Sequence, residues 1–263
     1  MPMRKKVTTI SFYLYGLGQG GAQKVAAQVM NNCVANGYRV SVIVYRKEDE
    51  NVDLSNLVER WYLKEDGYPL ERNPFIKLVN KLNQIVRFSR ITKSISPDVV
   101  VLFGPDPLAC IGVLFARYKG VLIGCERGDL NSRSSLYRSI LKQSVKRCDY
   151  AVFQFEGAIE RYKGYLPKKI AVIPNPCFTK TTQTRNQDAL RNSITASGRL
   201  VTEKGFDTLI EAFSLIERKI PNISLEIFGE GPDRERLESL IMDLKLEKRI
   251  RLCGFVPDPT EYI

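Results

Sequence analysis

The sequence predicts an α/β protein with two doubly wound, parallel-sheet domains, the second of them incomplete. Short apolar segments alternate with helical patterns along almost the whole chain, as they do when crossover helices join buried parallel strands. A polar segment, residues 179–192, interrupts this alternation before it restarts. The length of 263 residues also exceeds the roughly 100–200 residues of one domain.

The first part of the chain, residues 1–178, contains six short segments that are apolar on both faces. The expected strands are Val7–Tyr15, Val40–Tyr45, Val99–Phe103, Val121–Cys125, Tyr150–Phe155 and Ile170–Ile173. The expected helices are Gln23–Asn36, Phe75–Ser96, Leu108–Tyr118, Ser134–Arg147 and Gly157–Tyr162. Right-handed connections between such strands give a parallel sheet, so we expect this part to form one domain.

The second part of the chain follows a linker at residues 179–192. Its expected strands are Ser193–Ser197, Ser224–Phe228 and Arg249–Cys253, and its expected helices are Phe206–Lys219 and Pro232–Leu244. Three strands make about half of a doubly wound domain, which has roughly six. Residues 193–263 are therefore expected to form a partial domain.

The composition excludes several kinds of chemistry. The chain has no histidine, which rules out Ser-His-Asp and Cys-His nucleophiles, a histidine base and imidazole metal sites. The six cysteines include no C-x-x-C pair, so we expect free thiols in a reducing cytoplasm rather than a zinc site. No apolar stretch reaches the length of a membrane span.

A glycine-rich loop, Gly16–Gly21, separates the first expected strand from the first expected helix. It contains the spacing G-x-G-x-x-G, and backbone N–H groups at a helix N-terminus attract phosphate. The second strand is followed by Arg46 and Lys47 instead of the acidic residue of an NAD site, which leaves an NADP-dependent oxidoreductase as one interpretation. A tight turn without a ligand is the other.

Two cations, Arg199 and Lys204, stand between the strand at residues 193–197 and a helix. A forked guanidinium and a compact ammonium group beside a helix N-terminus suit a diphosphate at the carboxyl end of a parallel sheet. From the spacing alone, they could equally be solvent-exposed charges that pair with Glu203 and Asp207.

Several short motifs follow one another along the whole chain. They are Gly20-Gly21-Ala22, Gly124-Cys125-Glu126-Arg127-Gly128-Asp129, Ile173-Pro174-Asn175-Pro176, Gly198-Arg199-Leu200, Glu203-Lys204-Gly205, Leu209-Ile210-Glu211-Ala212-Phe213, Phe228-Gly229-Glu230-Gly231-Pro232 and Cys253-Gly254-Phe255-Val256. Together they resemble the retaining GT-B glycosyltransferases, and more narrowly the family 4 enzymes of bacterial surface polysaccharides. The resemblance implies two Rossmann-like domains and transfer of a sugar, with retention, from a UDP- or GDP-sugar to a lipid-linked or growing polysaccharide or lipopolysaccharide acceptor.

The resemblance also implies roles for individual residues. Arg199 and Lys204 would be catalytic, because they would bind the donor diphosphate and stabilise the departing nucleoside diphosphate. The donor-binding residues implied are Gly20, Gly21, Gly229, Phe255 and Val256. Fixed cations would meet the leaving-group charge, so neither a metal ion nor a cofactor is expected.

Two departures from the family pattern affect these expectations. Glu126 stands where many relatives place a histidine near the sugar, and the resemblance makes it a candidate catalytic residue, with Arg127 and Asp129 as acceptor-binding residues. Glu126 or Asp129 could orient the acceptor, or Glu126 could form a structural ion pair with Arg127. The family's Glu-x7-Glu donor motif would lie beyond residue 263. We therefore expect the 263 residues to lack part of the active site, which leaves a catalytically inactive fragment as an alternative.

Basic surface and net charge point to a polyanionic partner. Residues 77–93 and 133–147 are basic without an acidic residue, and the whole chain carries a net charge of +11. The apolar residues Phe75, Leu78, Val79, Leu82, Ile85 and Val86 share one helical face, which we expect to pack against the sheet. No nucleic-acid-binding module accompanies the charge. An anionic membrane surface is therefore favoured, with the protein peripheral on the cytoplasmic side.

Overall fold

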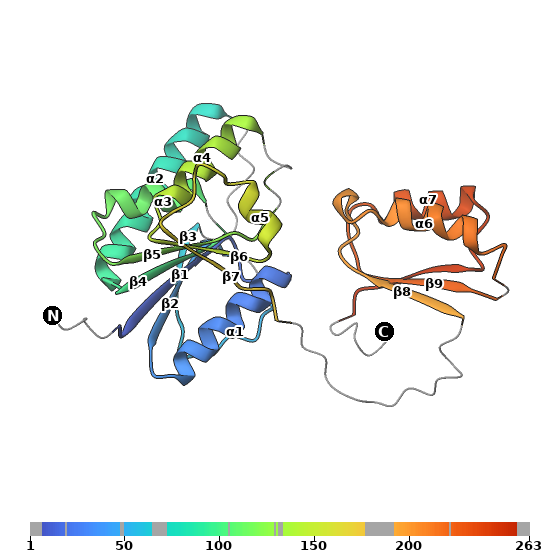
Figure 1. Ribbon diagram of the computed structural model, residues 1–263, viewed down its shortest axis with the longest axis horizontal. Coiled ribbons are helices and arrows are strands. Elements are labelled where there is room, and N and C mark those ends of the chain that lie inside the picture. Colours follow the sequence, from blue (N-terminus) through green and yellow to red (C-terminus); the bar gives the residue numbers. More distant parts are fainter. Residues whose placement is uncertain are drawn as a thin grey trace. The chain divides into compact units, whose positions relative to one another are not determined.

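The computed structural model describes residues 7–18, 20–47, 50–64, 73–104, 106–128, 130, 134–176, 192–220 and 222–256. The chain divides into an N-terminal unit, residues 1–176, and a C-terminal unit, residues 177–263, each coloured along the sequence in Figure 1. The predicted linker at residues 179–192 lies outside the described residues except for Asn192.

The N-terminal unit is built on one parallel sheet of seven strands in the order β3-β2-β1-β4-β5-β6-β7. The strands are β1 (Thr9–Leu14), β2 (Arg39–Arg46), β3 (Glu59–Lys64), β4 (Val99–Phe103), β5 (Val121–Cys125), β6 (Tyr150–Phe153) and β7 (Lys169–Val172). Six of them were predicted, and the edge strand β3 was missed. Its residues are charged at both ends and mostly half-buried, so β3 lacks the continuous apolar run that marks a central parallel strand.

Helices cover both faces of this sheet (Figure 1). Helix α1 (Gly21–Ala35) covers one face, and the other carries α2 (Pro74–Ile95), α3 (Pro107–Phe115), α4 (Ser135–Lys146) and α5 (Glu156–Glu160). The division follows from the strand order, because the chain leaves β1 toward β2 in one direction and crosses from β3 through β4 to β7 in the other. Right-handed crossovers made in opposite directions place their helices on opposite faces.

Helix α2 departs from the expectation that its apolar face packs on the sheet. Phe75 is 71% exposed and Leu78 is 55% exposed. Val79, Leu82 and Val86 are exposed as well. The buried side of the helix consists instead of Gln84, Phe88, Ser89, Ile91 and Thr92. The 22 residues of α2 would extend about 33 Å at 1.5 Å per residue, whereas a five-residue strand spans only about 17 Å, so the first half of the helix projects past the sheet.

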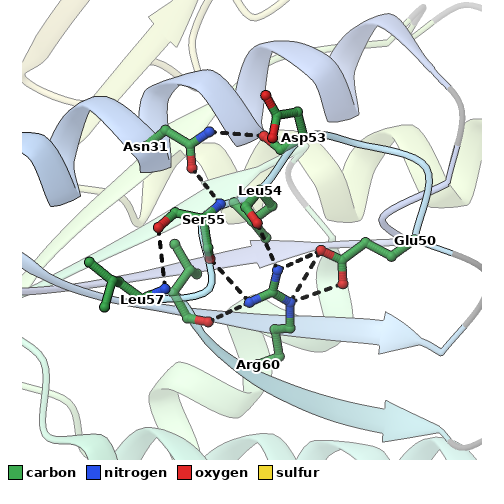
Figure 2. A network of polar contacts seen from close by, with 8 residues as sticks. Asn31, Glu50, Asp53, Leu54, Ser55, Leu57 and Arg60 are labelled. Atoms are coloured by element: carbon green, nitrogen blue, oxygen red, sulfur yellow. Dashed lines mark hydrogen bonds and ion pairs between the residues drawn. The ribbon is translucent and has the colours of Figure 1, made fainter.

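A network of polar contacts centred on Arg60 holds the connection between β2 and β3 in place (Figure 2). The Arg60 guanidinium donates to Glu50, with Nη2 2.6 Å from Oε1, and to the backbone carbonyls of Leu54, Ser55 and Val58. The amide of Asn31 on α1 also holds this connection, since it donates to the Asp53 carbonyl and accepts from the Ser55 N–H. These contacts replace the helix that usually joins two parallel strands.

Replacing Arg60 with alanine is expected to destabilise the N-terminal unit by about 2–3 kcal/mol, because three carbonyls lose a charged donor. Arg60→Lys should lose most of the same stability, since an ammonium group cannot reproduce the guanidinium fork. Urea unfolding followed by the fluorescence of Trp61, the single tryptophan of the chain, measures the change. Lys119→Ala, at an exposed position in the same unit, serves as the control, and an Arg60→Ala midpoint equal to that of Lys119→Ala would contradict the role given to the network.

The C-terminal unit contains a parallel sheet in the order β10-β9-β8. Its elements are β8 (Ser193–Ser197), the 3₁₀ turn η2 (Thr202–Lys204), α6 (Phe206–Ile216), β9 (Ser224–Phe228), α7 (Arg234–Asp243) and β10 (Ile250–Gly254). Helices α6 and α7 lie side by side on one face of this sheet (Figure 1), over a core that includes Phe206, Ile210, Phe213, Leu225 and Leu237. A seven-stranded and a three-stranded parallel sheet confirm the predicted fold class.

The five cysteines that the structure describes, Cys33, Cys110, Cys125, Cys148 and Cys253, are free thiols. Cys177 lies outside the described residues. Within the described part of the chain, no helix combines the length and the apolar character needed to cross a bilayer.

Candidate functional site

The carboxyl ends of the three strands in the C-terminal unit meet through glycines. The Gly229 N–H donates to the Gly254 carbonyl at 2.7 Å, and the Gly198 N–H donates to the Phe228 carbonyl at 2.9 Å. Gly229 has a φ of +148°, and a Cβ at this position would overlap the carbonyl oxygen of Gly198. Only glycine therefore lets these strand ends approach so closely.

The loop from Gly198 to Gly205, which carries both predicted cations, is anchored to the loop that follows β9. The Leu200 N–H donates to the Glu230 carbonyl at 3.0 Å, and the Asp233 N–H donates to the Leu200 carbonyl at 3.1 Å. Gly231 packs against the Leu200 backbone so closely that a Cβ would overlap it. Backbone contacts on both sides thus fix the start of the cation-bearing loop.

A side-chain network continues this anchoring toward η2. The Thr202 hydroxyl donates to Asp233 at 2.8 Å, and Arg236 donates to Asp233 at 3.0 Å and to Asp207 at 3.1 Å. The pKa of Asp207 is lowered, first by the Thr208 backbone N–H and then by Arg236. Hydrogen bonds from Thr202 and Arg236 likewise lower the pKa of Asp233. Both carboxylates are therefore ionised at neutral pH, and both form ion pairs with Arg236.

Arg199 and Lys204 are exposed on this anchored loop. The alternative in which they pair with Glu203 and Asp207 does not occur in the described part of the C-terminal unit, since Asp207 pairs with Arg236 instead. Neither cation forms an ion pair with any residue that the structure describes. Two cations that have no carboxylate partner among the described residues, on a loop at the carboxyl end of a parallel sheet, suit a phosphate-bearing ligand.

The other residues predicted to bind the donor in this unit lie at the same edge of the sheet. Phe255 and Val256 directly follow β10, and Phe255 is 51% exposed. Gly254, with a φ of +81°, turns the chain at this point. The structure thus brings Arg199, Lys204, Gly229, Phe255 and Val256 onto loops at one edge.

The predicted residues of the N-terminal unit also lie at the carboxyl edge of their own sheet. Gly20 is the extended N-cap residue of α1, and Gly21 is its first residue. A Cβ at Gly21 would have no atom within 4 Å, whereas a Cβ at Gly20 would meet only the flexible end of Gln23. The space beside Gly21 is therefore open, and neither glycine is required by its packing.

Glu126, predicted to be catalytic, follows β5 and is only 7% exposed. Its carboxylate accepts from the Gly128 N–H at 3.1 Å. Burial, and secondarily the charge of Glu126, raises the pKa of Tyr162. The Glu126 carboxylate is therefore largely buried in the N-terminal unit and already accepts a hydrogen bond there. Asp129, predicted with Arg127 at the acceptor, lies outside the described residues.

Arg127 is held by residues that the sequence did not single out as site residues. Its guanidinium carbon lies 4.3 Å from the centre of the Phe103 ring, and its Nη1 donates to the Asn175 side chain. The ion pair with Glu126 that the sequence left open is replaced by this contact with Asn175. Asn175 stands in the motif Ile173-Pro174-Asn175-Pro176, which was the only signal that could have indicated its position.

Comparison with known protein families identifies the family to which this chain belongs. Residues 19–180 match the family described as Glycosyltransferase Family 4, and residues 180–263 match Glycosyl transferases group 1. The chain belongs to glycosyltransferase family 4. This confirms the resemblance seen in the motifs. Membership of a glycosyltransferase family also disfavours the oxidoreductase interpretation of the Gly16–Gly21 loop.

Several named glycosyltransferases are similar to this chain. The chain is 25% identical over 252 residues to the lipopolysaccharide core biosynthesis glycosyltransferase LpsE of Rhizobium meliloti, covering 93% of this chain and 66% of LpsE. It is 22% identical over 268 residues to the N-acetylgalactosamine-N,N'-diacetylbacillosaminyl-diphospho-undecaprenol 4-alpha-N-acetylgalactosaminyltransferase of Campylobacter jejuni, covering 97% of this chain and 71% of that protein. The chain thus spans about two thirds of the length of each of these two relatives.

Solved GT-B structures share the fold of this family 4 chain. The apo form of the lipopolysaccharide outer core galactosyltransferase WaaB has a TM-score of 0.68 at 18% identity, covering 97% of this chain and 70% of WaaB. The pneumococcal O-GlcNAc transferase GtfA, solved in complex with UDP and GlcNAc, has a TM-score of 0.73 at 13% identity, covering 98% of this chain and 78% of GtfA. At these identities the likeness establishes the fold alone.

Proposed function

We propose that this protein transfers a sugar from a UDP- or GDP-sugar to a lipid-linked or growing polysaccharide or lipopolysaccharide acceptor, with retention at the anomeric carbon. The observation that carries the proposal is the pair of Arg199 and Lys204, which lie on an anchored loop and have no carboxylate partner in the part of the chain that the structure describes. The class of acceptor is supported by two similar proteins, one a lipopolysaccharide core biosynthesis glycosyltransferase and the other a transferase that acts on a diphospho-undecaprenol-linked sugar.

The proposed role of the carboxyl edge of the C-terminal sheet follows from the negative charge that develops on the leaving group. When the bond from the anomeric carbon to the diphosphate oxygen breaks, its electron pair stays on the nucleoside diphosphate. Arg199 and Lys204 would stabilise that negative charge, and a loop already anchored in place needs little reorganisation to do so. Gly229 and the exposed ring of Phe255 would border the nucleotide, while Gly20 and Gly21 would admit the sugar. We propose that this chemistry uses neither a metal ion nor a cofactor.

Transfer can be tested with UDP- and GDP-sugars and polyprenyl-diphosphate-linked acceptors, using a catalytically active form of the protein. Nucleotide release should depend on both substrates, and the NMR coupling of the new anomeric proton should show the configuration of the donor sugar. An inverted product would contradict retention. Nucleotide release that requires no acceptor would contradict transfer.

We also propose that an anionic membrane surface is a partner of the N-terminal unit. Helices α2, α3 and α4 lie on one face of the sheet and contain no acidic residue. They expose a set of apolar side chains, named here the α2–α4 surface: Phe75, Ile76, Leu78, Val79, Leu82, Val86, Ile111, Leu114, Phe115, Leu136, Tyr137 and Ile140. Their basic residues are Lys77, Lys81, Arg87, Arg90, Lys93, Arg138, Lys142 and Lys146.

Many exposed apolar side chains on neighbouring helices mark an interaction surface, and the basic residues among them favour a negatively charged partner. In a right-handed crossover, α2 begins at the carboxyl edge of the sheet. The projecting half of α2 therefore lies on the side of the unit that carries Gly21 and Arg127. We propose that the protein is peripheral on the cytoplasmic side of the membrane, where a lipid-linked acceptor would meet this edge.

Binding to vesicles is expected to rise with phosphatidylglycerol content in phosphatidylcholine vesicles and to weaken as salt rises to 0.15 M, where the screening length is about 8 Å. Leu78→Ser with Leu82→Ser should reduce co-flotation at least fivefold, by loss of about 1.5–3 kcal/mol for each buried side chain. Leu215→Ser, at a position 71% exposed on α6, is the matched control. Equal binding by the double variant and the control would contradict this partner, as would a change in oligomeric state without vesicle binding.

A further inference from the structure

Arg127 has a surrounding of neutral groups that sets it apart from the arginines of the ion pairs described above. The Phe103 ring lies against one side of its guanidinium, and the Asn175 side chain accepts from Nη1. Burial raises the pKa of the neighbouring Cys125 thiol to about 11, although the charge of Arg127 and its contact with the thiol act in the opposite direction. Cys125 is therefore a neutral neighbour of Arg127. The nearest carboxylate in sequence, Glu126, accepts from the Gly128 N–H. Among the described residues, no acidic side chain forms an ion pair with Arg127.

One donor of this guanidinium is left unused. Arg127 Nε is buried and has no hydrogen-bond partner within the described chain. A buried donor without a partner costs about 1–3 kcal/mol, and in a native structure such a group calls for a specific reason. The contact with the Phe103 ring restrains the guanidinium, so its remaining donors are held ready for an oxyanion.

We infer that Arg127 and Asn175 form an anion subsite in the N-terminal unit that binds the diphosphate group of the acceptor. The inference rests on the proposed function for the class of acceptor, whereas the subsite itself is inferred from the unpaired, stacked guanidinium. Arg127 follows β5 and Asn175 follows β7, so both lie at the carboxyl edge of the sheet, where α2 begins. A lipid held by the α2–α4 surface would present its diphosphate to this unit, while Arg199 and Lys204 take the donor diphosphate in the other.

The subsite can be tested on the 263-residue chain with citronellyl diphosphate, a soluble prenyl diphosphate, and with UDP as a second probe. Arg127→Gln should raise the Kd for citronellyl diphosphate at least tenfold and leave the Kd for UDP unchanged. The Kd of Arg127→Lys for citronellyl diphosphate should lie between those of wild type and Arg127→Gln, because an ammonium group keeps the charge but lacks the forked donors of a guanidinium. Arg161→Gln is the matched control, since Arg161 also lies over a phenylalanine ring, that of Phe155, at 5.8 Å.

Two further arms separate the alternatives. Inorganic pyrophosphate should show the same dependence on Arg127, whereas citronellol should not bind measurably; dependence on Arg127 for citronellol would contradict an anion subsite. Arg199→Ala should weaken the binding of UDP and leave the binding of citronellyl diphosphate unchanged. Unchanged UDP binding in this variant would therefore count against the proposed donor site and not against the anion subsite. An unchanged Kd for citronellyl diphosphate in Arg127→Gln, or a parallel loss of UDP binding, would overturn the inference.

A measurement on the unsubstituted chain guards against a variant that fails to fold. The Nε–H resonance of Arg127 should shift when citronellyl diphosphate is added and should remain in place when UDP is added. The thermal midpoint of Arg127→Gln is compared with that of Arg161→Gln. A resonance that does not respond to citronellyl diphosphate would overturn the inference whatever the variants do.

Discussion

Replacing either Arg199 or Lys204 with alanine is expected to lower the turnover number about a hundredfold, the usual cost of losing one preorganised charge contact to a developing oxyanion. Both cations are exposed on a loop that backbone hydrogen bonds hold in place. The loss should therefore come from missing charge and leave the fold intact. Initial rates at saturating donor and acceptor, on a catalytically active form of the protein, measure the effect.

Arg218→Ala is the matched control, because the Arg218 side chain is 84% exposed in the same unit and lies only 3.8 Å from Glu217 in a weak ion pair. Its turnover should equal that of the wild type. Turnover close to the wild-type value in both Arg199→Ala and Lys204→Ala would remove the diphosphate role from this loop.

Gly229→Ala should have the largest effect on stability, at about 3 kcal/mol or more, since backbone strain alone costs about 1–3 kcal/mol. The added Cβ would overlap the Gly198 carbonyl, and the φ of +148° is one that L-residues rarely adopt. The strand ends that carry the cation-bearing loop would have to separate. Trp61 reports on the N-terminal unit, so amide hydrogen exchange of β8, β9 and β10 is the measurement that detects this loss.

Gly205→Ala provides the comparison for Gly229→Ala. Gly205 has a φ of +67°, but a Cβ there would have no atom within 4 Å. Its cost should therefore be the left-handed backbone alone, about 1–2 kcal/mol. Equal protection losses in the two variants would mean that the close approach of Gly229 to Gly198 has no energetic importance.

The sequence predicted the central elements of both sheets well because their physics is local. Val99–Phe103 and Ser224–Phe228 were predicted with the bounds that the structure has, since short apolar runs between helical patterns are typical of buried parallel strands. Strand β3 was missed because an edge strand needs only one apolar side. The apolar face of α2 was assigned to the sheet because periodicity shows that a face is apolar but not what covers it.

For the site, the sequence was informative about residue types and less so about their partners. It placed Arg199 and Lys204 on a loop after a strand, but their freedom from Asp207 depends on Arg236, which stands 29 residues away from Asp207. The stacking of Arg127 on Phe103 and its bond to Asn175 join three separate strand ends, which no local pattern reveals. Gly229 was predicted to border the nucleotide, and its tight contact with Gly198 gives it a packing role as well.

The nucleoside diphosphate is expected to bind at the carboxyl edge of the C-terminal sheet. Titration of the ¹⁵N-labelled 263-residue chain with UDP, GDP and uridine tests it most directly. With either nucleotide, amide shifts should concentrate at Arg199, Lys204, Gly229, Phe255 and their neighbours, and uridine without phosphates should perturb the loop from Gly198 to Gly205 far less. Shifts confined to Gly16–Gly21 and the adjoining edge of the N-terminal unit would contradict the account.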